Sequence, residues 1–433
     1  MTNIWDHLEA SFNGSRRVRS MLAAVVAVIG VLAISIAIKK ALTRELDVFV
    51  ILNASRDLLN GADIYASPAP NGAYYLYLPL LAFIFIPLTL VPQAVAGALW
   101  TLLCITLIWW CLHESIKLVA GDAYGELKSF HVWGLHLLPV ILCADAISSE
   151  VGNAQLNCLI LGAGILGLKL TGARRYVAGG AVIGIAAVAK VFTAPILLYE
   201  LLNRRFRTGI GSVIAGAIGL LLPATIIGWQ RNIGYVDYWT KNIALHQDLT
   251  THPSGFAGNA SLQAVLTRLL TDEPAFVWQG SAYRMNLASL DPAAISTLGI
   301  FVPVLAVLLL VLYFAIFHGR RELISYWGGI ALAFCVAPLI TPVVERPHFL
   351  MLLPAYVYVC WLGLYEGLKR RWFYLLLAGA WVLSTFTLKL YVGDFWGNVF
   401  WALGAPMLAD LCLIAAIFLA ASGEDIPELT PER

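Results

Sequence analysis

Long runs of apolar residues, separated by short polar stretches, fill most of this chain. The first run, Met21 to Ile38, follows a cluster of arginines at positions 16, 17 and 19. Because a membrane-spanning helix needs about 20 mostly apolar residues, the pattern predicts an all-α polytopic membrane protein with about eleven to thirteen spans. The further runs cover residues 75–91, 95–112, 131–147, 154–171, 176–203, 208–228, 296–317, 323–342, 349–368, 372–391 and 398–421.

Composition agrees with this pattern. Of the 433 residues, 60% are hydrophobic and 12% are charged, about half the charged share of a soluble protein. No small-residue cleavage site follows the first run, so we expect a retained span and one integral membrane domain over residues 1–433. The net charge of +2 gives no bulk attraction to nucleic acid.

The basic clusters predict which way the chain crosses the membrane. Short loops rich in Lys and Arg stay on the cytoplasmic side, and such clusters lie at 16–19, 174–175, 204–207, 320–321 and 369–371. Both termini are therefore expected on the cytoplasmic side of the membrane, with two polar segments outside: 39–74, carrying an amphipathic helix, and the large loop 229–295. Run 75–91 should cross only part of the membrane, and run 176–203 should form short or broken helices that are interrupted near Lys190 and Pro195.

Asp47 directly follows the first span and precedes a helical pattern that Gly61 should end. It is either a cap of that helix or a general base, which must reach a substrate hydroxyl. Asp57 and Asp63 are best explained as the solvated face and exit of a surface helix. Arg56 shares that face and is also a candidate substrate-binding residue.

Other polar residues of the predicted exterior face have two interpretations each. Tyr75 and Tyr77 fit an interfacial aromatic belt or a sugar platform. Amides and a carboxylate after residue 148 fit helix capping or a hydroxyl-rich ligand. In the large loop, Asn259 and Ser261 fit a glycosylation sequence or ligand contacts. The amides and the carboxylate after residue 148 belong to Glu150, Asn153, Gln155 and Asn157.

Lys190 is the most specific single residue, since a lysine inside a span faces a cavity or a partner. Glu345, Arg346 and His348 interrupt two apolar runs and form either an internal ion pair or a substrate site. Arg346 could bind a phosphate bidentately, and His348 could bind the same phosphate. Together these groups suit transfer from an anionic lipid donor, with Asp47 as base.

Neither metal nor cofactor chemistry is indicated by the sequence. The seven cysteines lie inside apolar runs at irregular spacing, and no zinc, Walker, nucleophile-elbow or Rossmann pattern occurs. Lys190, Arg346 and His348 could supply the positive charge, so we expect a metal-independent enzyme that uses a lipid-phosphate sugar as its donor substrate and needs no cofactor.

In order along the chain, these segments resemble the bacterial family-87 glycosyltransferases of the GT-C superfamily, whose best-known members use polyprenyl-phosphate mannose to elongate phosphatidylinositol mannosides. The similar segments are Asp47 to Tyr65, Tyr77 with Pro79, "GNAQLN", "KVFTAP", "GNASL" and "TPVVERPHFLMLLPA".

The resemblance implies a GT-C-type bundle and an inverting transferase on the exterior face, with mannose as the default sugar and a glycolipid or cell-envelope glycan as acceptor. It also implies that Asp47 is the base, that Lys190 and His348 lie near the donor phosphate, and that Tyr65 belongs to the substrate site. The chain departs from the family pattern at Ile51 and Leu52, where tyrosines are usual, and at Pro347, where a second histidine is usual; Arg346 is added.

Two other classes of function fit part of the pattern. In a lipid-linked-sugar flippase, Lys190 and Arg346 would line a path, but its charges would more often lie near the midplane in matched halves. A structural assembly subunit would not need Asp47, Lys190 and His348 together. The one-sided polar segments favour the transferase.

Overall fold

The structure is a computed structural model that describes all residues except 1–8, 44, 67, 70–71, 245–257 and 424–433. It is 78% helical with almost no sheet, which confirms the all-α class. Its helices are α2 Arg16–Thr43, α3 Val48–Asn60, α4 Pro79–Ile84, α5 Gln93–Ala120, α6 Ser129–Leu142, α7 Ala144–Asn153, α8 Asn157–Gly172, α9 Tyr176–Ala189, α10 Ala194–Leu202, α11 Phe206–Leu221, α12 Ala224–Ile227, α13 Trp229–Trp239, α14 Leu262–Leu270, α15 Pro292–Phe317, α16 Gly328–Leu339, α17 Leu353–Leu364, α18 Arg371–Trp381, α19 Lys389–Ala402 and α20 Ala405–Ala421. Short 3-10 helices are η1 Ile86–Leu90, η2 Gly121–Glu126, η3 Val191–Thr193 and η6 Arg346–Leu352, and π-helices are η4 Thr240–Ala244, η5 Leu323–Trp327 and η7 Val382–Phe386.

Several helices are long and apolar enough to cross a membrane. Five such segments occur among the described residues, or up to seven if the bent pairs α6–α7 and α18–α19 each count as one span. Five shorter apolar segments of 10–17 residues accompany them. A polytopic membrane protein is therefore confirmed, while the expected number of eleven to thirteen spans stays a prediction.

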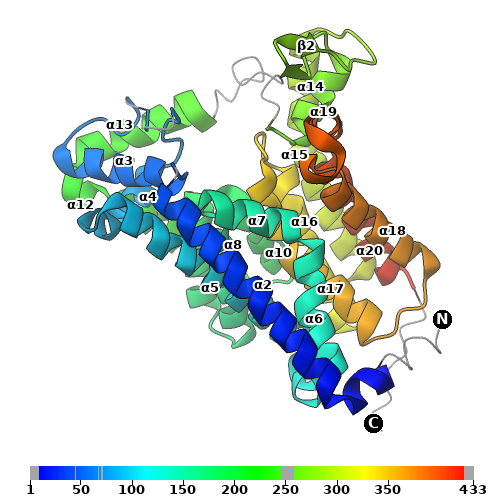
Figure 1. Ribbon diagram of the computed structural model, residues 1–433. Helices are drawn as coiled ribbons and strands as arrows, with labels where there is room; N and C mark the ends of the chain where they lie inside the picture. The colour runs from blue at the N-terminus through cyan, green and yellow to red at the C-terminus, as the bar shows by residue number, and fades with distance from the viewer. Residues whose placement is uncertain (1–8, 44, 67, 70–71, 245–257, 424–433) are drawn as a thin grey trace.

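Helices α16 and α17 form the centre of the bundle. Every residue of α16 is buried, as are the first ten of α17, Leu353 to Leu362. By contrast, α2 buries only Ala37 and Ala41 and runs along the outside of the bundle (Figure 1). Exposed Leu, Ile and Val side chains on α2 are what a lipid-facing helix requires.

Both interrupted runs are broken where their sequences predict it. Residues 79–90 form only the short helices α4 and η1, since Pro79 begins one and Pro87 lies at the start of the other. At Lys190 the backbone is extended, with φ −158° and ψ 126°, between the end of α9 and the 3-10 turn η3. The break places the lysine side chain inside the bundle rather than on a continuous helical face.

The segments predicted to be exterior form two groups at the same end of the bundle. In Figure 1, α3, α12 and α13 lie on the left, and α14, the β-hairpin and α19 lie at the upper right. Arg231 of α13 donates to the carbonyls of Gly61 and Ala62, at 2.6 and 2.8 Å, which ties α13 to the end of α3. The hairpin pairs β1 Phe276–Trp278 with β2 Ser281–Tyr283, and its aromatic rings contact Phe395.

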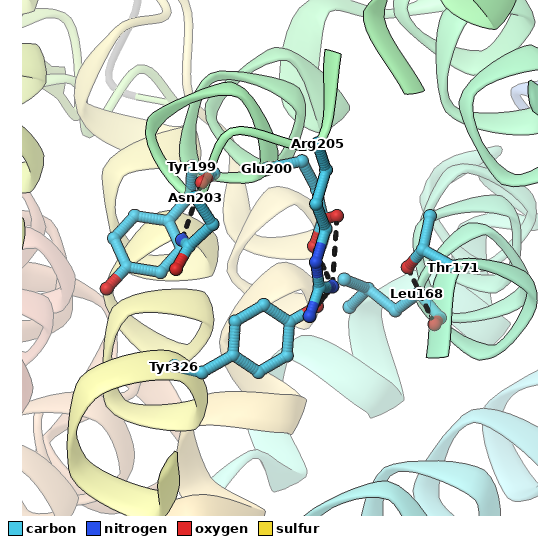
Figure 2. A network of polar contacts seen from close by, with 7 residues as sticks. All are labelled: Leu168, Thr171, Tyr199, Glu200, Asn203, Arg205 and Tyr326. Carbon is cyan, nitrogen blue, oxygen red and sulfur yellow. Dashed lines mark hydrogen bonds and ion pairs between the residues drawn. The ribbon is translucent and has the colours of Figure 1, made fainter. Parts of the chain in front are cut away.

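A buried ion pair joins three elements near the end that the charge rule assigns to the cytoplasm. Arg205 Nη1 lies 3.2 and 3.1 Å from the two carboxylate oxygens of Glu200, whose side chain is fully buried. Figure 2 shows Tyr326 of η5 beside both residues: its hydroxyl donates to Glu200 and accepts from Arg205. The network holds the α10–α11 turn against η5.

We expect Arg205→Met to destabilise the protein by about 3 kcal/mol, because the variant leaves the Glu200 carboxylate buried without its cation. Thermal unfolding in detergent measures this effect. The double variant Arg205→Met with Glu200→Gln should recover much of the loss, since it removes both charges. If the single and double variants unfold at the same temperature, the ion pair does not have this role.

Candidate active site

Asp47 precedes α3, but its side chain does not cap that helix. Its carboxylate Oδ2 instead accepts a hydrogen bond of 2.5 Å from the Gln155 amide, which lies between α7 and α8. The Asp47 backbone N–H donates to the Asn153 carbonyl at 3.0 Å. The capping interpretation is therefore wrong. The Asp47 carboxylate is instead held by the segment between α7 and α8.

Burial raises the pKa of Asp47 above its usual value of 3.8. The Gln155 hydrogen bond and the charges of Lys40 and Lys190 lower the pKa and oppose this shift. A carboxylate with a raised pKa is a stronger base, and one held by an amide donor keeps a fixed orientation. Both properties suit proton abstraction.

A second group of polar side chains surrounds Lys190. Its Nζ lies 2.7 Å from His348 Nε2 and donates to Asn157 Oδ1 at 2.8 Å. The Asn157 amide donates in turn to Glu150 Oε2 at 2.8 Å, and the Cys158 N–H donates to Oε1 at the same distance. Glu150 and Asn157 are fully buried, so this chain of bonds fixes the lysine from one side.

His348 is held by the first turn of η6. Its Nδ1 accepts from the Glu345 backbone N–H at 2.9 Å, which leaves Nε2 facing Lys190. In the neutral ring Nε2 carries the proton, so it can donate to an uncharged Lys190 amine or to an anion that lies between the two groups. The Phe192 ring supports it edge-on at 5.1 Å between centroids. Two nitrogen donors that converge in this way suit an anion whose oxygen accepts from both.

Glu345 connects the two groups electrostatically. Burial raises the pKa of its carboxyl group, the charge of Asp47 raises it further, and Lys190 lowers it. Tyr77 also faces this cluster: burial raises its pKa, and the charges of Asp47, Glu345 and Glu150 raise it further. The charges of Asp47, Lys190 and Glu345 thus act on one another across the two groups.

The other predicted tyrosines support this site from behind. The Tyr65 hydroxyl donates to the Tyr77 carbonyl at 2.8 Å, and its ring stacks on Tyr238 of α13 at 4.9 Å. Tyr75 is buried and its hydroxyl donates to the Leu78 carbonyl at 2.6 Å. Arg56 donates to Asn53 and to Gln93, at 3.0 and 3.3 Å, on the α3 surface.

Asn259 and Ser261 join two loops. The Asn259 side chain donates to the Pro342 carbonyl and accepts from the N–H groups of Ser261 and Val344. Ser261 caps α14 through a 3.1 Å bond from the Ala264 N–H. A buried, hydrogen-bonded Asn259 is unsuited to glycosylation in the folded protein, so we interpret both residues as a brace for the segment that carries Glu345.

Arg346 makes its contacts in a different direction from His348. Its guanidinium lies 4.0 Å from Asp145 and 4.7 Å above the Trp401 ring. With Asn153, Glu345, Lys389 and Asn398 it lines a cavity of about 330 Å³. Lys389 was not predicted as a site residue, because it lies near the end of run 372–391. It is nevertheless a lysine within an apolar run, which was the reason for selecting Lys190.

Cys104, Glu150 and Cys158 are the one group of His, Cys, Asp or Glu side chains in the described part of the chain whose ligand atoms lie close enough for a metal ion. All three are buried. Both Glu150 oxygens already accept hydrogen bonds from Asn157 and Cys158, and the Cys104 thiol donates to the Gln155 carbonyl. These contacts suit a packing role beside Gln155.

Comparison with known protein families decides the class. The sequence model of glycosyltransferase family 87 matches residues 75–342. The chain belongs to glycosyltransferase family 87. The matched part of this family-87 glycosyltransferase contains Glu150, Gln155, Asn157 and Lys190, whereas Asp47 and His348 lie outside it. No curated protein and no solved structure matches the chain.

Proposed function

We propose that this membrane glycosyltransferase moves a sugar, with mannose as the expected one, from a polyprenyl-phosphate donor to a glycolipid or cell-envelope glycan on the exterior face of a bacterial plasma membrane. The observation that carries the proposal is a half-buried carboxylate, Asp47, held by Gln155 and within electrostatic reach of Lys190, which pairs with His348. A base and an anion site are the two parts that such a transfer needs.

The reaction is a single displacement at the anomeric carbon. Asp47 accepts the proton of an acceptor hydroxyl while that oxygen forms the new glycosidic bond. The bond between the anomeric carbon and the phosphate oxygen breaks, and the phosphate leaves with the electron pair. Lys190 and His348 stabilise the negative charge on the leaving phosphate, with Glu150 and Asn157 holding Lys190 in place.

Gln155 and Tyr77 are the proposed contacts nearest the transferred sugar, because the Gln155 amide donates to Asp47 and the charge of Asp47 acts on Tyr77. Tyr65 and Tyr75 support Tyr77 from behind. We also propose a metal-independent reaction, in which the side chains of Lys190 and His348 do the work that a divalent cation does in other transferases.

The stereochemistry of the product tests this mechanism. A single displacement inverts the anomeric carbon, so the new bond should have the opposite configuration to the sugar phosphate in the donor. NMR analysis of the product made by purified protein measures it. Retention of configuration would require a covalent intermediate and would contradict the role of Asp47 as base.

The pH dependence should report Asp47 directly. A base acts when deprotonated, and burial raises the pKa of Asp47, so kcat/KM should fall as the pH drops through that raised value. Because the Gln155 hydrogen bond lowers this pKa, Gln155→Leu should move the acid limb of the profile to higher pH. An acid limb at the same pH in wild type and variant would show that another group is titrating.

A further inference from the structure

The cavity of about 330 Å³ lies between α7, η6 and α19, and its size is within the range of small-molecule sites. Asn153 connects it to the base: its side chain lines the cavity, while its carbonyl accepts from the Asp47 backbone N–H. A ligand in the cavity would therefore lie one residue, Asn153, away from Asp47, on the side lined by Arg346 rather than at the Lys190–His348 pair.

The charges of this cavity are mainly positive. Arg346 and Lys389 line it, together with one carboxylate, Glu345, and the amides of Asn153 and Asn398. The contact of Arg346 with Asp145, at 4.0 Å, is much longer than a charge-assisted hydrogen bond of about 2.8 Å. Arg346 is therefore available to a closer anion.

The bend before α19 points Lys389 toward this cavity. The axis turns by 91° between α18–η7 and α19. Within α19, Gly393 has φ 78° and interrupts the helix, a conformation that favours glycine. The stem of Lys389 packs on Gly397, where an added β-carbon would lie 2.5 Å from Lys389 Cγ. The absence of a side chain at Gly397 therefore leaves space for the aliphatic part of Lys389.

From this arrangement we infer that the cavity binds the acceptor and that the accepting sugar itself carries an anionic group, a carboxylate or a phosphate, held by Arg346 and Lys389. The neutral amides would contact the sugar hydroxyls, and the hydroxyl that reacts would face Asp47. The inference rests on the proposed transferase function and adds the charge class of the acceptor to it.

Binding of three probes to the Asp47→Asn protein tests the inference without any transfer step. The probes are hexyl glucoside, hexyl glucuronide and the 6-phosphate of hexyl glucoside, measured by calorimetry in lipid nanodiscs. At least one anionic probe should bind about 10-fold or more tightly than the neutral probe. The preferred anion distinguishes a carboxylate-bearing from a phosphate-bearing acceptor.

In the Asp47→Asn background, Lys389→Gln should weaken the preferred anionic probe about 10-fold and leave the neutral probe unchanged. Lys39→Gln is the matched control, since Lys39 is exposed on α2 and does not line the cavity. Equal affinities for all three probes, no binding of any probe, or an equal loss of all probes in Lys389→Gln would overturn the inference. Because no donor is present, these outcomes leave the transfer test of the proposed function independent.

Discussion

Replacement of Asp47 by Asn should lower kcat for sugar transfer by about 10³-fold or more, within the range that a general base contributes. Asparagine keeps the shape of the side chain and can still contact the Gln155 side chain, but it cannot accept a proton from the acceptor. Lys190 and His348 are unchanged in this variant, so the affinity for the polyprenyl-phosphate donor should stay within about twofold. Single-turnover transfer and equilibrium donor binding measure the two quantities separately.

Asp57→Asn is the matched control for this variant, because Asp57 lies on the same helix and is only partly buried. We expect wild-type transfer from it. Turnover near the wild-type rate in Asp47→Asn would remove Asp47 from the base role. A parallel loss of donor affinity would instead show that Asp47 positions the donor.

Lys190→Met should weaken donor binding about 10- to 100-fold, because a charge-assisted hydrogen bond contributes about 1.5–3 kcal/mol. His348→Asn should also weaken donor binding, because it removes a different hydrogen-bond donor to the phosphate. Asparagine can still accept from the Glu345 N–H, as Nδ1 does, but it lacks the Nε2 donor that faces Lys190. Binding of the donor and of free polyprenyl phosphate should fall together, since both carry the phosphate.

The control for the lysine is Lys169→Met, which removes a lysine whose partner is the carboxylate of Glu114, at 2.6 Å, rather than Asn157 and His348. Because Lys169 is on the opposite end of α8 from Asn157, donor binding should be unchanged. Unaltered affinity in both Lys190→Met and His348→Asn would contradict the phosphate site. Comparison of unfolding temperatures separates this result from loss of fold.

Local sequence signals predicted the elements that carry the site, but not their contacts. The helix after Asp47 and the break at Lys190 follow from Gly61, Pro195 and a charge inside an apolar run, which act over a few residues. The bonds from Gln155 to Asp47 and from Lys190 to His348 join residues far apart in the chain. Such pairs depend on how the helices pack, which no local pattern encodes.

The positions of Arg346 and Lys389 could not be predicted from local sequence patterns either. The sequence grouped Arg346 with its neighbour His348, yet a short 3-10 turn directs the two side chains to different surroundings. Lys389 and Trp401 line the cavity from the two sides of Gly393, where the helical backbone of α19 is interrupted, and no pattern of the sequence predicts that they meet there. The hairpin at 276–283 was also unexpected, since its strands are three residues each and too short for a periodic pattern.

The most direct measurement incubates the purified protein, in lipid nanodiscs, with isotopically labelled polyprenyl-phosphate mannose, polyprenyl-phosphate glucose and the matching nucleotide sugars, each with a membrane-lipid extract as acceptor. Mass spectrometry then follows the label into products. We predict label transfer from a polyprenyl-phosphate sugar by wild type, none from the nucleotide sugars, and almost none by Asp47→Asn. Transfer from a nucleotide sugar, or no transfer from any polyprenyl-phosphate sugar, would contradict the proposed function.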